Sequence, residues 1–313
     1  MSEEKVVMVT GANGYIGQHV VAALCQRGYK VRAVVRPNVR PDDSQFLKEC
    51  GAHLVPLDLL NHAQVQKEVQ GGDYVVHLVG SINKPQGEDF MTMHEKRTRS
   101  LIEALKKSQP KKIIFVSALG ASFRSDSQYQ VSKWEAEEVI RKSFLPYVIL
   151  RSSLVVGRQC GTRDSKLITR MTDTVKNRPF IPVISRVDGK LQPVFIGDLV
   201  KLVCESIEHP QLQRHTIEVG GPDIVTPFQI METIAEILGI PKKKKVIPFF
   251  WVHLGISILE KISSSPQMTL EQLNMMRHDN IVRFPNMENY FTFPMTPLKE
   301  ALSYLKRNNL LPS

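Results

Sequence analysis

The sequence predicts an α/β protein with a doubly wound parallel sheet and a smaller, mainly helical C-terminal lobe. Short runs rich in Val and Ile alternate with amphipathic helical stretches through the first half of the chain. A glycine-rich turn follows the first of these runs, and Pro and Gly interrupt the alternation after about residue 155. We therefore expect a first domain over 1–155 and a lobe over 156–313, with segments from 190–220 completing the sheet.

The predicted strands are continuous apolar runs, as expected for strands that are buried on both faces. They lie at Val6–Val9, Lys30–Val35, His53–Leu57, Tyr74–Val79, Ile113–Ser117 and Tyr147–Arg151. The helical patterns between them lie at Gln18–Arg27, Asp42–Cys50, Asn61–Val69, Glu88–Ser108 and Gln128–Ser143. Strands that alternate with helices imply crossover connections, and these make the sheet parallel.

The stretch TGANGYIG, residues 10–17, joins the first strand to the first helix. Gly11 permits a tight turn, Gly14 lets the backbone approach a pyrophosphate, and Gly17 allows close packing of helix and strand. The start of the helix offers free N–H groups to an anion. A plain turn is the alternative, but the strand before it and the helix after it favour a Rossmann-type dinucleotide site. The predicted contacts here are Gly11, Asn13, Gly14, Tyr15, Ile16 and Gly17.

Arg36 ends the second predicted strand, where an NAD site carries an acidic residue that binds the ribose. A carboxylate there repels a 2′-phosphate, whereas a guanidinium binds it with two hydrogen bonds. Arg40 offers a second positive contact. The alternative is an ordinary exposed arginine at a strand end. We therefore predict NADP(H) as the cofactor, with NAD(H) less favoured.

Tyr129 and Lys133 are four residues apart, so on a helix they share one face. A free tyrosine has a pKa near 10 and is a poor acid or base at neutral pH. A neighbouring ammonium favours the phenolate, so we expect Lys133 to lower the pKa of Tyr129 and to hold the nicotinamide ribose. The alternative is a surface Tyr and Lys on an amphipathic helix.

These motifs resemble the extended and atypical branch of the short-chain dehydrogenase/reductase superfamily. The resemblance rests on TGxxGxxG, on the YxxxK pair and on further segments along nearly the whole chain: Asp58–Leu59, His77–Gly80, Phe115–Ala118, Arg151–Ser153, Pro193–Asp198 and Glu218–Pro222. VSALGA, YQVSKWEAE and MTLEQLNMMRHDNIV are most similar to relatives of the nucleotide-binding accessory subunit of respiratory complex I.

The resemblance implies a set of further cofactor contacts: Asp58, Leu59, Leu78, Val79, Gly80, Val116, Ser117, Tyr129, Lys133, Ser152 and Leu154. It implies Tyr129, Lys133 and a Ser or Thr as catalytic residues, but Ala118 stands where the hydroxyl residue is expected. Ser117 is one place earlier, and neighbouring strand residues point to opposite faces. Ser117 is therefore only a conjectural substitute, and the catalytic site looks incomplete beside an intact cofactor site.

The net charge of +10 allows nucleic acid, an anionic membrane surface or a phosphate-bearing ligand as partners. No basic motif with interleaved aromatic residues appears, so we expect no nucleic acid. Residues 242–261 join four lysines to an aromatic-rich helical pattern. This segment predicts either a helix packed against the substrate cleft or a peripheral contact with a membrane or a protein complex. Related folds also pair as homodimers.

The sequence contains no run of about 18 apolar residues, so we expect no membrane-spanning helix. Its polar start does not resemble a targeting signal. The four cysteines show no paired spacing, which predicts reduced thiols in a cytoplasmic compartment, at most peripheral to a membrane. They are Cys25, Cys50, Cys160 and Cys204. We expect no metal, because no His or Cys cluster has the spacing of a metal site.

Three functions remain open from the sequence. The first is an NADP(H)-dependent oxidoreductase that acts on a carbonyl, an alcohol or a reducible double bond of a small molecule. The second is a non-catalytic NADPH-bound scaffold or redox sensor in a larger, respiratory-type complex. Ala118 favours this function, because it replaces the expected catalytic hydroxyl residue. The third is a sugar-nucleotide epimerase or dehydratase, which Arg36 disfavours because such enzymes usually keep NAD.

Overall fold

Seven parallel strands form one sheet in the order β10–β6–β5–β4–β1–β2–β3 in a computed structural model that describes residues 5–82, 87–262, 268–284 and 287–307. The strands are β1 Val6–Thr10, β2 Lys30–Val35, β3 His53–Pro56, β4 Tyr74–His77, β5 Lys112–Ala118, β6 Tyr147–Ser152 and β10 His215–Val219. The chain leaves β1 toward β2 on one side and returns to β4 on the other. A ligand crevice is therefore expected outside the carboxyl ends of β1 and β4.

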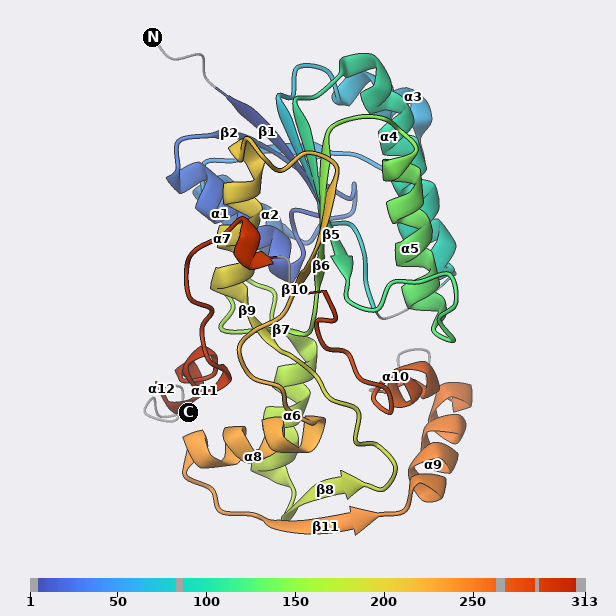
Figure 1. Cartoon of the computed structure of the whole chain (residues 1–313), viewed down its shortest axis with the longest axis vertical. Coiled ribbons are helices and arrows are strands. Elements are labelled where there is room, and N and C mark those ends of the chain that lie inside the picture. The colour runs from blue at the N-terminus through green and yellow to red at the C-terminus, as the bar shows by residue number, and fades with distance from the viewer. Residues whose placement is uncertain (1–4, 83–86, 263–267, 285–286, 308–313) are drawn as a thin grey trace.

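Helices cover both faces of the sheet (Figure 1). Helices α1 Tyr15–Gln26, α2 Pro41–Glu49 and α7 Ile196–Glu208 share one core with the first face, and α1 packs along α7. Helices α3 His62–Glu68, α4 Arg97–Ser108 and α5 Gln128–Arg141 share the core of the opposite face. The fully buried runs of β4 and β5 explain why their sequences are continuously apolar. The predicted α/β class is confirmed.

The predicted helix over Glu88–Ser108 differs from the observed structure in one respect. A π-helical turn, Thr92–Lys96, precedes α4, and it places Met93 and His94 in buried positions. Such turns are rare and are frequent at functional sites. No local propensity distinguishes them from an α-helix, so the sequence pattern did not indicate this one.

The C-terminal lobe lies below the carboxyl ends of the strands in Figure 1. Its elements are α6 Lys166–Asn177, β8 Phe180–Ile184, α8 Pro227–Leu238, β11 Lys243–Ile247, α9 Phe249–Ile262, α10 Leu270–Met275, α11 Leu298–Ala301 and α12 Tyr304–Arg307. Helices α6 and α8 pack together around a third apolar core. A short parallel pair, β7 Val155–Val156 and β9 Val194–Phe195, lies between sheet and lobe, and Met287–Asn289 form a 3₁₀ turn.

Residues 242–261 form a strand followed by a helix, so three of the four lysines lie in a strand. Lys243–Ile247 form β11, which pairs in parallel with β8, and Pro248 separates this strand from α9. In α9 only Ile256 is buried, so the helix does not pack closely into the lobe. None of the helices in the described ranges is long and apolar enough to cross a membrane.

Candidate cofactor and active site

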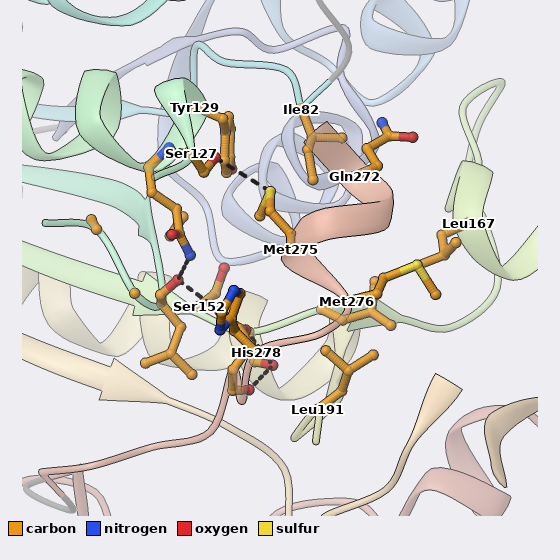
Figure 2. Close-up of a pocket in the computed structure, with 18 of the residues that line it drawn as sticks. Ile82, Ser127, Tyr129, Ser152, Leu167, Leu191, Gln272, Met275, Met276 and His278 are labelled. Carbon is orange, nitrogen blue, oxygen red and sulfur yellow. Dashed lines mark hydrogen bonds between the residues drawn. The ribbon is translucent and has the colours of Figure 1, made fainter. Parts of the chain in front are cut away.

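A cleft of about 1530 Å³ separates the carboxyl ends of the strands from the C-terminal lobe. Ile16 of the glycine turn and Gly80 after β4 line it, together with Tyr129, Lys133 and Ser152. Figure 2 shows side chains of α5, β6, α6 and α10 converging on this space. The cleft therefore joins the predicted cofactor turn to the predicted catalytic pair.

The glycine turn has little room for side chains. Gly11 has a φ of +69°, and an added Cβ would lie 2.9 Å from the carbonyl carbon of Leu78. At Gly17 an added Cβ would lie 2.2 Å from the carbonyl oxygen of Gly11, so the helix packs directly on the turn. Gly14 caps α1, and neither a side-chain cap nor an acidic residue occupies the first turn of the helix. This helix start fits a diphosphate, because its N–H groups attract negative charge.

Tyr15 and the other predicted contacts of the turn lie at the start of α1 or just before it. The Tyr15 hydroxyl donates to the carbonyl oxygen of Gly157 at 2.9 Å, so this residue joins the turn to the segment after β7. Asn13 is half-buried beside the turn, and Ile16 lines the cleft. These positions agree with a cofactor lying along the turn, and direct contact stays a prediction.

Arg36 is exposed at the end of β2, and its Nη2 donates to the Met93 sulfur at 3.8 Å. This guanidinium is therefore weakly held and able to meet a phosphate. Asp58 is exposed after β3, and its carboxylate accepts from the amide of Leu60 at 3.0 Å. Leu59 instead is buried in the core under α3 and α4.

Arg40 is engaged in a cluster around the buried carboxylate of Asp43. Arg40 donates to Asp43 at 3.1 and 3.3 Å, and Arg163 donates to it through both Nε and Nη2. Thr162 and Gln18 complete the set. Burial alone would raise the pKa of Asp43, but these hydrogen bonds outweigh it and hold the pKa well below its usual range. The cluster ties α1, α2 and the loop before α6 together.

Tyr129 lies on the first turn of α5, and its half-buried side chain lines the cleft. Burial raises its pKa to about 12. The pKa of Tyr129 is therefore raised rather than lowered in the protein alone, and burial is the cause. That Lys133, together with the charge of an oxidised cofactor, favours the phenolate stays a prediction. The phenol keeps its proton at neutral pH, which suits a proton donor better than a base.

Lys133 is buried, and its Nζ donates to the carbonyl oxygen of Val116 at 2.9 Å. The ammonium also lies 4.3 Å from the centre of the Phe115 ring. Burial lowers its pKa to about 7, and Glu137 offsets only part of this effect. A Cβ at Gly80 would lie 3.5 Å from the same Nζ, so the strand end and the lysine meet closely.

Replacing Lys133 with Met should raise the free energy of unfolding by about 2 kcal/mol at pH 7, because the folded state no longer buries an ammonium. The lost hydrogen bond to Val116 limits the gain. Because the folded pKa lies below the unfolded one, wild-type stability rises between pH 7 and about 10.5. The advantage of the variant should therefore be largest below pH 7 and vanish near pH 10.5. Urea unfolding at several pH values measures this, and an advantage that grows with pH contradicts it.

Two buried histidines connect the strand ends to helices α4 and α5. The Ser81 amide donates to His94 Nε2 at 3.2 Å, so His94 Nδ1 carries the proton toward Ser132 Oγ, 2.8 Å away. His77 Nδ1 lies 2.6 Å from Thr10 Oγ1, and His77 Nε2 lies 2.9 Å from Thr98 Oγ1. Both rings are buried, and burial lowers the pKa of His77 to about 3 and of His94 to about 2. They stay neutral, as expected for structural histidines.

His94 also packs edge-on against Tyr129, with ring centres 5.4 Å apart. From the other side Glu271 of α10 accepts from the Tyr129 amide at 3.0 Å and from Ser127 at 2.8 Å. Glu271 and Tyr129 are 142 residues apart, and no local pattern indicated this contact. The two contacts position the tyrosine between the π-helical turn and the lobe.

Ser117 Oγ is buried and has no hydrogen-bond partner among the described residues, and Ser117 and Ala118 both line the cleft. The remaining predicted contacts surround the same space: Leu78, Gly80, Val116, Ser152 and Leu154 line the cleft, and Val79 packs on the core beneath α4. Within the described ranges no group of three potential ligands lies close enough to bind a metal ion.

The doubly wound sheet and the glycine turn at its first crossover define a Rossmann-type nucleotide-binding protein. A family model described as NAD(P)H-binding matches residues 11–179, more than half of the chain. The chain therefore belongs to the NAD(P)H-binding family, and its relatives confirm the resemblance to extended short-chain dehydrogenases/reductases.

One relative is the mitochondrial NADH dehydrogenase [ubiquinone] 1 alpha subcomplex subunit 9 of Mus musculus. It is 24% identical over 97% of this chain and 80% of its own length. The Arabidopsis thaliana subunit is 24% identical over 88% of this chain and 71% of its own. The ceramide reductase of Caulobacter vibrioides is 25% identical over 75% of this chain and 71% of its own. These relatives share the nucleotide-binding class but carry different names.

Solved structures of sugar-nucleotide enzymes share the fold. UDP-glucose 4-epimerase of Thermotoga maritima superposes with a TM-score of 0.72 at 18% identity, over 98% of this chain and all of its own. The dTDP-glucose 4,6-dehydratase of Bacillus anthracis, solved with NAD, gives 0.73 at 15% identity, over 97% and 96%. At these identities the likeness establishes the fold alone.

Proposed function

We propose that this protein is an NADP(H)-dependent oxidoreductase that reduces a carbonyl group of a small molecule. The observation that carries the proposal is that Tyr129 and Lys133 line the same cleft as the glycine turn. When bound there, the dinucleotide supplies a hydride to the carbonyl carbon. The Tyr129 hydroxyl gives its proton to the carbonyl oxygen, which yields the alcohol and a tyrosinate beside Lys133. A pKa of about 12 keeps this proton available at neutral pH.

The substrate side of the cleft is largely apolar. Side chains of the lobe supply this lining: Leu167, Met171, Leu191, Met231, Met275 and Met276. Methionine adapts to irregular apolar ligands. We therefore favour a carbonyl compound with a bulky or long apolar part, whose reactive end lies beside Tyr129.

Replacing Arg36 with Ser should weaken NADPH binding about 10- to 100-fold and leave NADH binding unchanged. A hydrogen-bonded pair of guanidinium and phosphate contributes about 1.5–3 kcal/mol, and only NADPH carries the 2′-phosphate. Titration calorimetry with both nucleotides measures the effect. Arg27→Ser, an exposed arginine at the other end of α1, is the matched control. Equal losses for both nucleotides would remove the role of Arg36.

A second candidate is a non-catalytic NADPH-bound subunit of a larger assembly. Ala118 favours it, because the second hydrogen-bond donor that would polarise the carbonyl is absent from that position. The names of the complex I relatives are consistent with assembly into a complex. An epimerase or dehydratase rests only on the shared fold. A homodimer is a further prediction, which a sedimentation measurement tests.

Hydride transfer can be followed without knowing the substrate. The protein is incubated with NADPH deuterated at the transferred position and with a panel of aldehydes and ketones, including long-chain ones. An alcohol heavier by one deuterium supports the oxidoreductase. NADPH that binds tightly but passes deuterium to no compound supports the non-catalytic subunit, and absence of binding contradicts both.

A further inference from the structure

Helix α9 exposes six large apolar side chains to solvent. They are Phe250, Trp251, Leu254, Ile258, Leu259 and Ile262, with exposed fractions between 40% and 75%. His253, Glu260 and Lys261 are the acidic or basic residues of this helix. Burying such side chains is strongly favourable, and exposed apolar patches of this kind mark interaction sites. We call these six residues the apolar half of α9.

The apolar half is a convex stripe rather than a ring. At about 100° per residue, the six side chains fall within one half of the helix circumference, and the buried Ile256 lies outside it. Lys261 lies within that half, where a long stem can extend its ammonium to a polar boundary. Figure 1 places α9 at the outer side of the lobe, beside α10 and directly after β11.

A basic strand precedes this helix. Lys244 pairs with Glu232 of α8 at 2.8 Å and lies 4.4 Å from the Phe228 ring, so it faces α8. Alternation along β11 therefore turns Lys243 and Lys245 to the opposite face of the strand, and both are exposed. Lys245 also lies over the ring of Phe180 at 5.0 Å.

We propose that the apolar half of α9, together with Lys243 and Lys245, docks this protein on an anionic bilayer surface. The aromatic and aliphatic side chains enter the boundary between headgroups and acyl chains, and the lysines meet anionic headgroups. This combination of an apolar helix face and nearby basic residues is what an interfacial anchor requires. The docking does not depend on the reaction at Tyr129.

Other occupants fit the surface less well. In a twofold dimer through this surface, the lysines of both copies would approach one another, and like charges repel. A protein partner needs a matching groove for a convex helix, whereas a bilayer adapts to it. Helix α10 contacts α9 and ends at Met275, which lines the cleft together with the following Met276, so docking would bring the apolar cleft close to the membrane.

Vesicle flotation tests the proposal with the full chain. Wild type should float with vesicles of equal parts phosphatidylcholine and phosphatidylglycerol, and much less with phosphatidylcholine alone. In a Trp134→Phe background Trp251 is the remaining tryptophan, and its emission should shift to the blue and be quenched by brominated lipid. This fluorescence signal locates the contact at α9.

Two variants separate the two parts of the surface. Phe250→Ser with Ile258→Ser should weaken binding to the mixed vesicles at least tenfold. Lys243→Glu with Lys245→Glu should weaken it about thirtyfold or more, since each lysine near an anionic surface contributes about fivefold. Phe144→Ser, a similarly exposed residue between α5 and β6, is the control and should bind like wild type. Circular dichroism checks that each variant folds.

Several outcomes overturn the proposal. Failure of the wild type to float with the anionic vesicles would overturn it, and so would unchanged flotation of the variant with both α9 substitutions. Self-association that the same substitutions abolish, without any lipid binding, would assign the surface to a second copy of the chain.

Discussion

Replacing Tyr129 with Phe should lower kcat for carbonyl reduction by about 10²–10⁴-fold, the contribution expected of a positioned proton donor. The hydroxyl is the only part of the side chain removed, so its packing against His94 is preserved. The affinity for NADPH should stay unchanged within about twofold, since phosphate binding rests on the glycine turn and on arginine rather than on this hydroxyl. Single-turnover oxidation of bound NADPH measures the loss directly.

Tyr304→Phe is the matched control for this substitution. Burial raises the pKa of Tyr304 as it does for Tyr129, but Tyr304 packs in the core of the lobe on α12. Its loss should leave the rate unchanged. A rate for Tyr129→Phe equal to wild type would mean that the proton comes from another group, and the proposed function would lose its main support.

The raised pKa of Tyr129 favours reduction over alcohol oxidation at neutral pH. A tyrosine that titrates near pH 12 keeps its proton at neutral pH and serves reduction, whereas alcohol oxidation needs the phenolate. Lys133, with a pKa of about 7, is charged below neutrality and can stabilise the tyrosinate that forms. Reduction should therefore slow as pH rises through the pKa of Lys133.

Local patterns predicted the parts of this molecule that depend on neighbouring residues. Strands β1 and β2 follow from apolar runs, the turn follows from the glycine spacing, and the exposure of Arg36 follows from its place at a strand end. The helix over Gln128–Ser143 was placed within two residues of α5. These features need only a few adjacent residues, and a short segment carries that information.

The arrangement around the site could not be predicted in the same way. The contacts of Glu271 with Tyr129, of Arg163 with Asp43 and of His94 with Ser132 join segments that are 142, 120 and 38 residues apart. In the protein alone the pKa of Tyr129 is raised, opposite to the predicted direction, because it depends on burial, and burial follows from the packing of the whole fold. Spacing on one helix showed that Tyr129 and Lys133 share a face, but not which acceptor the lysine would find.

Asp43→Asn should lower the free energy of unfolding by about 3 kcal/mol at pH 7. The carboxylate is fully buried, and its removal leaves Arg163 and Arg40 without their shared negative partner. Both arginines keep access to water, with side-chain exposures of 32% for Arg163 and 52% for Arg40. The loss of stability should therefore lie at the low end of the range for a broken buried ion pair. The segment that carries Thr162 and Arg163 should detach from α1 and α2 first.

The pH dependence identifies the carboxylate as the cause. The folded pKa of Asp43 lies below its unfolded value near 3.9, so its stabilisation is complete above that value and is lost as pH falls through the folded pKa. The difference between wild type and Asp43→Asn should thus be constant at neutral pH and shrink in acid. Urea unfolding from pH 7 to pH 2 measures it, with the exposed neighbour Asp42→Asn as the control. If the control lost as much stability, or if the difference persisted at low pH, the cluster would not hold the loop through the charge of Asp43.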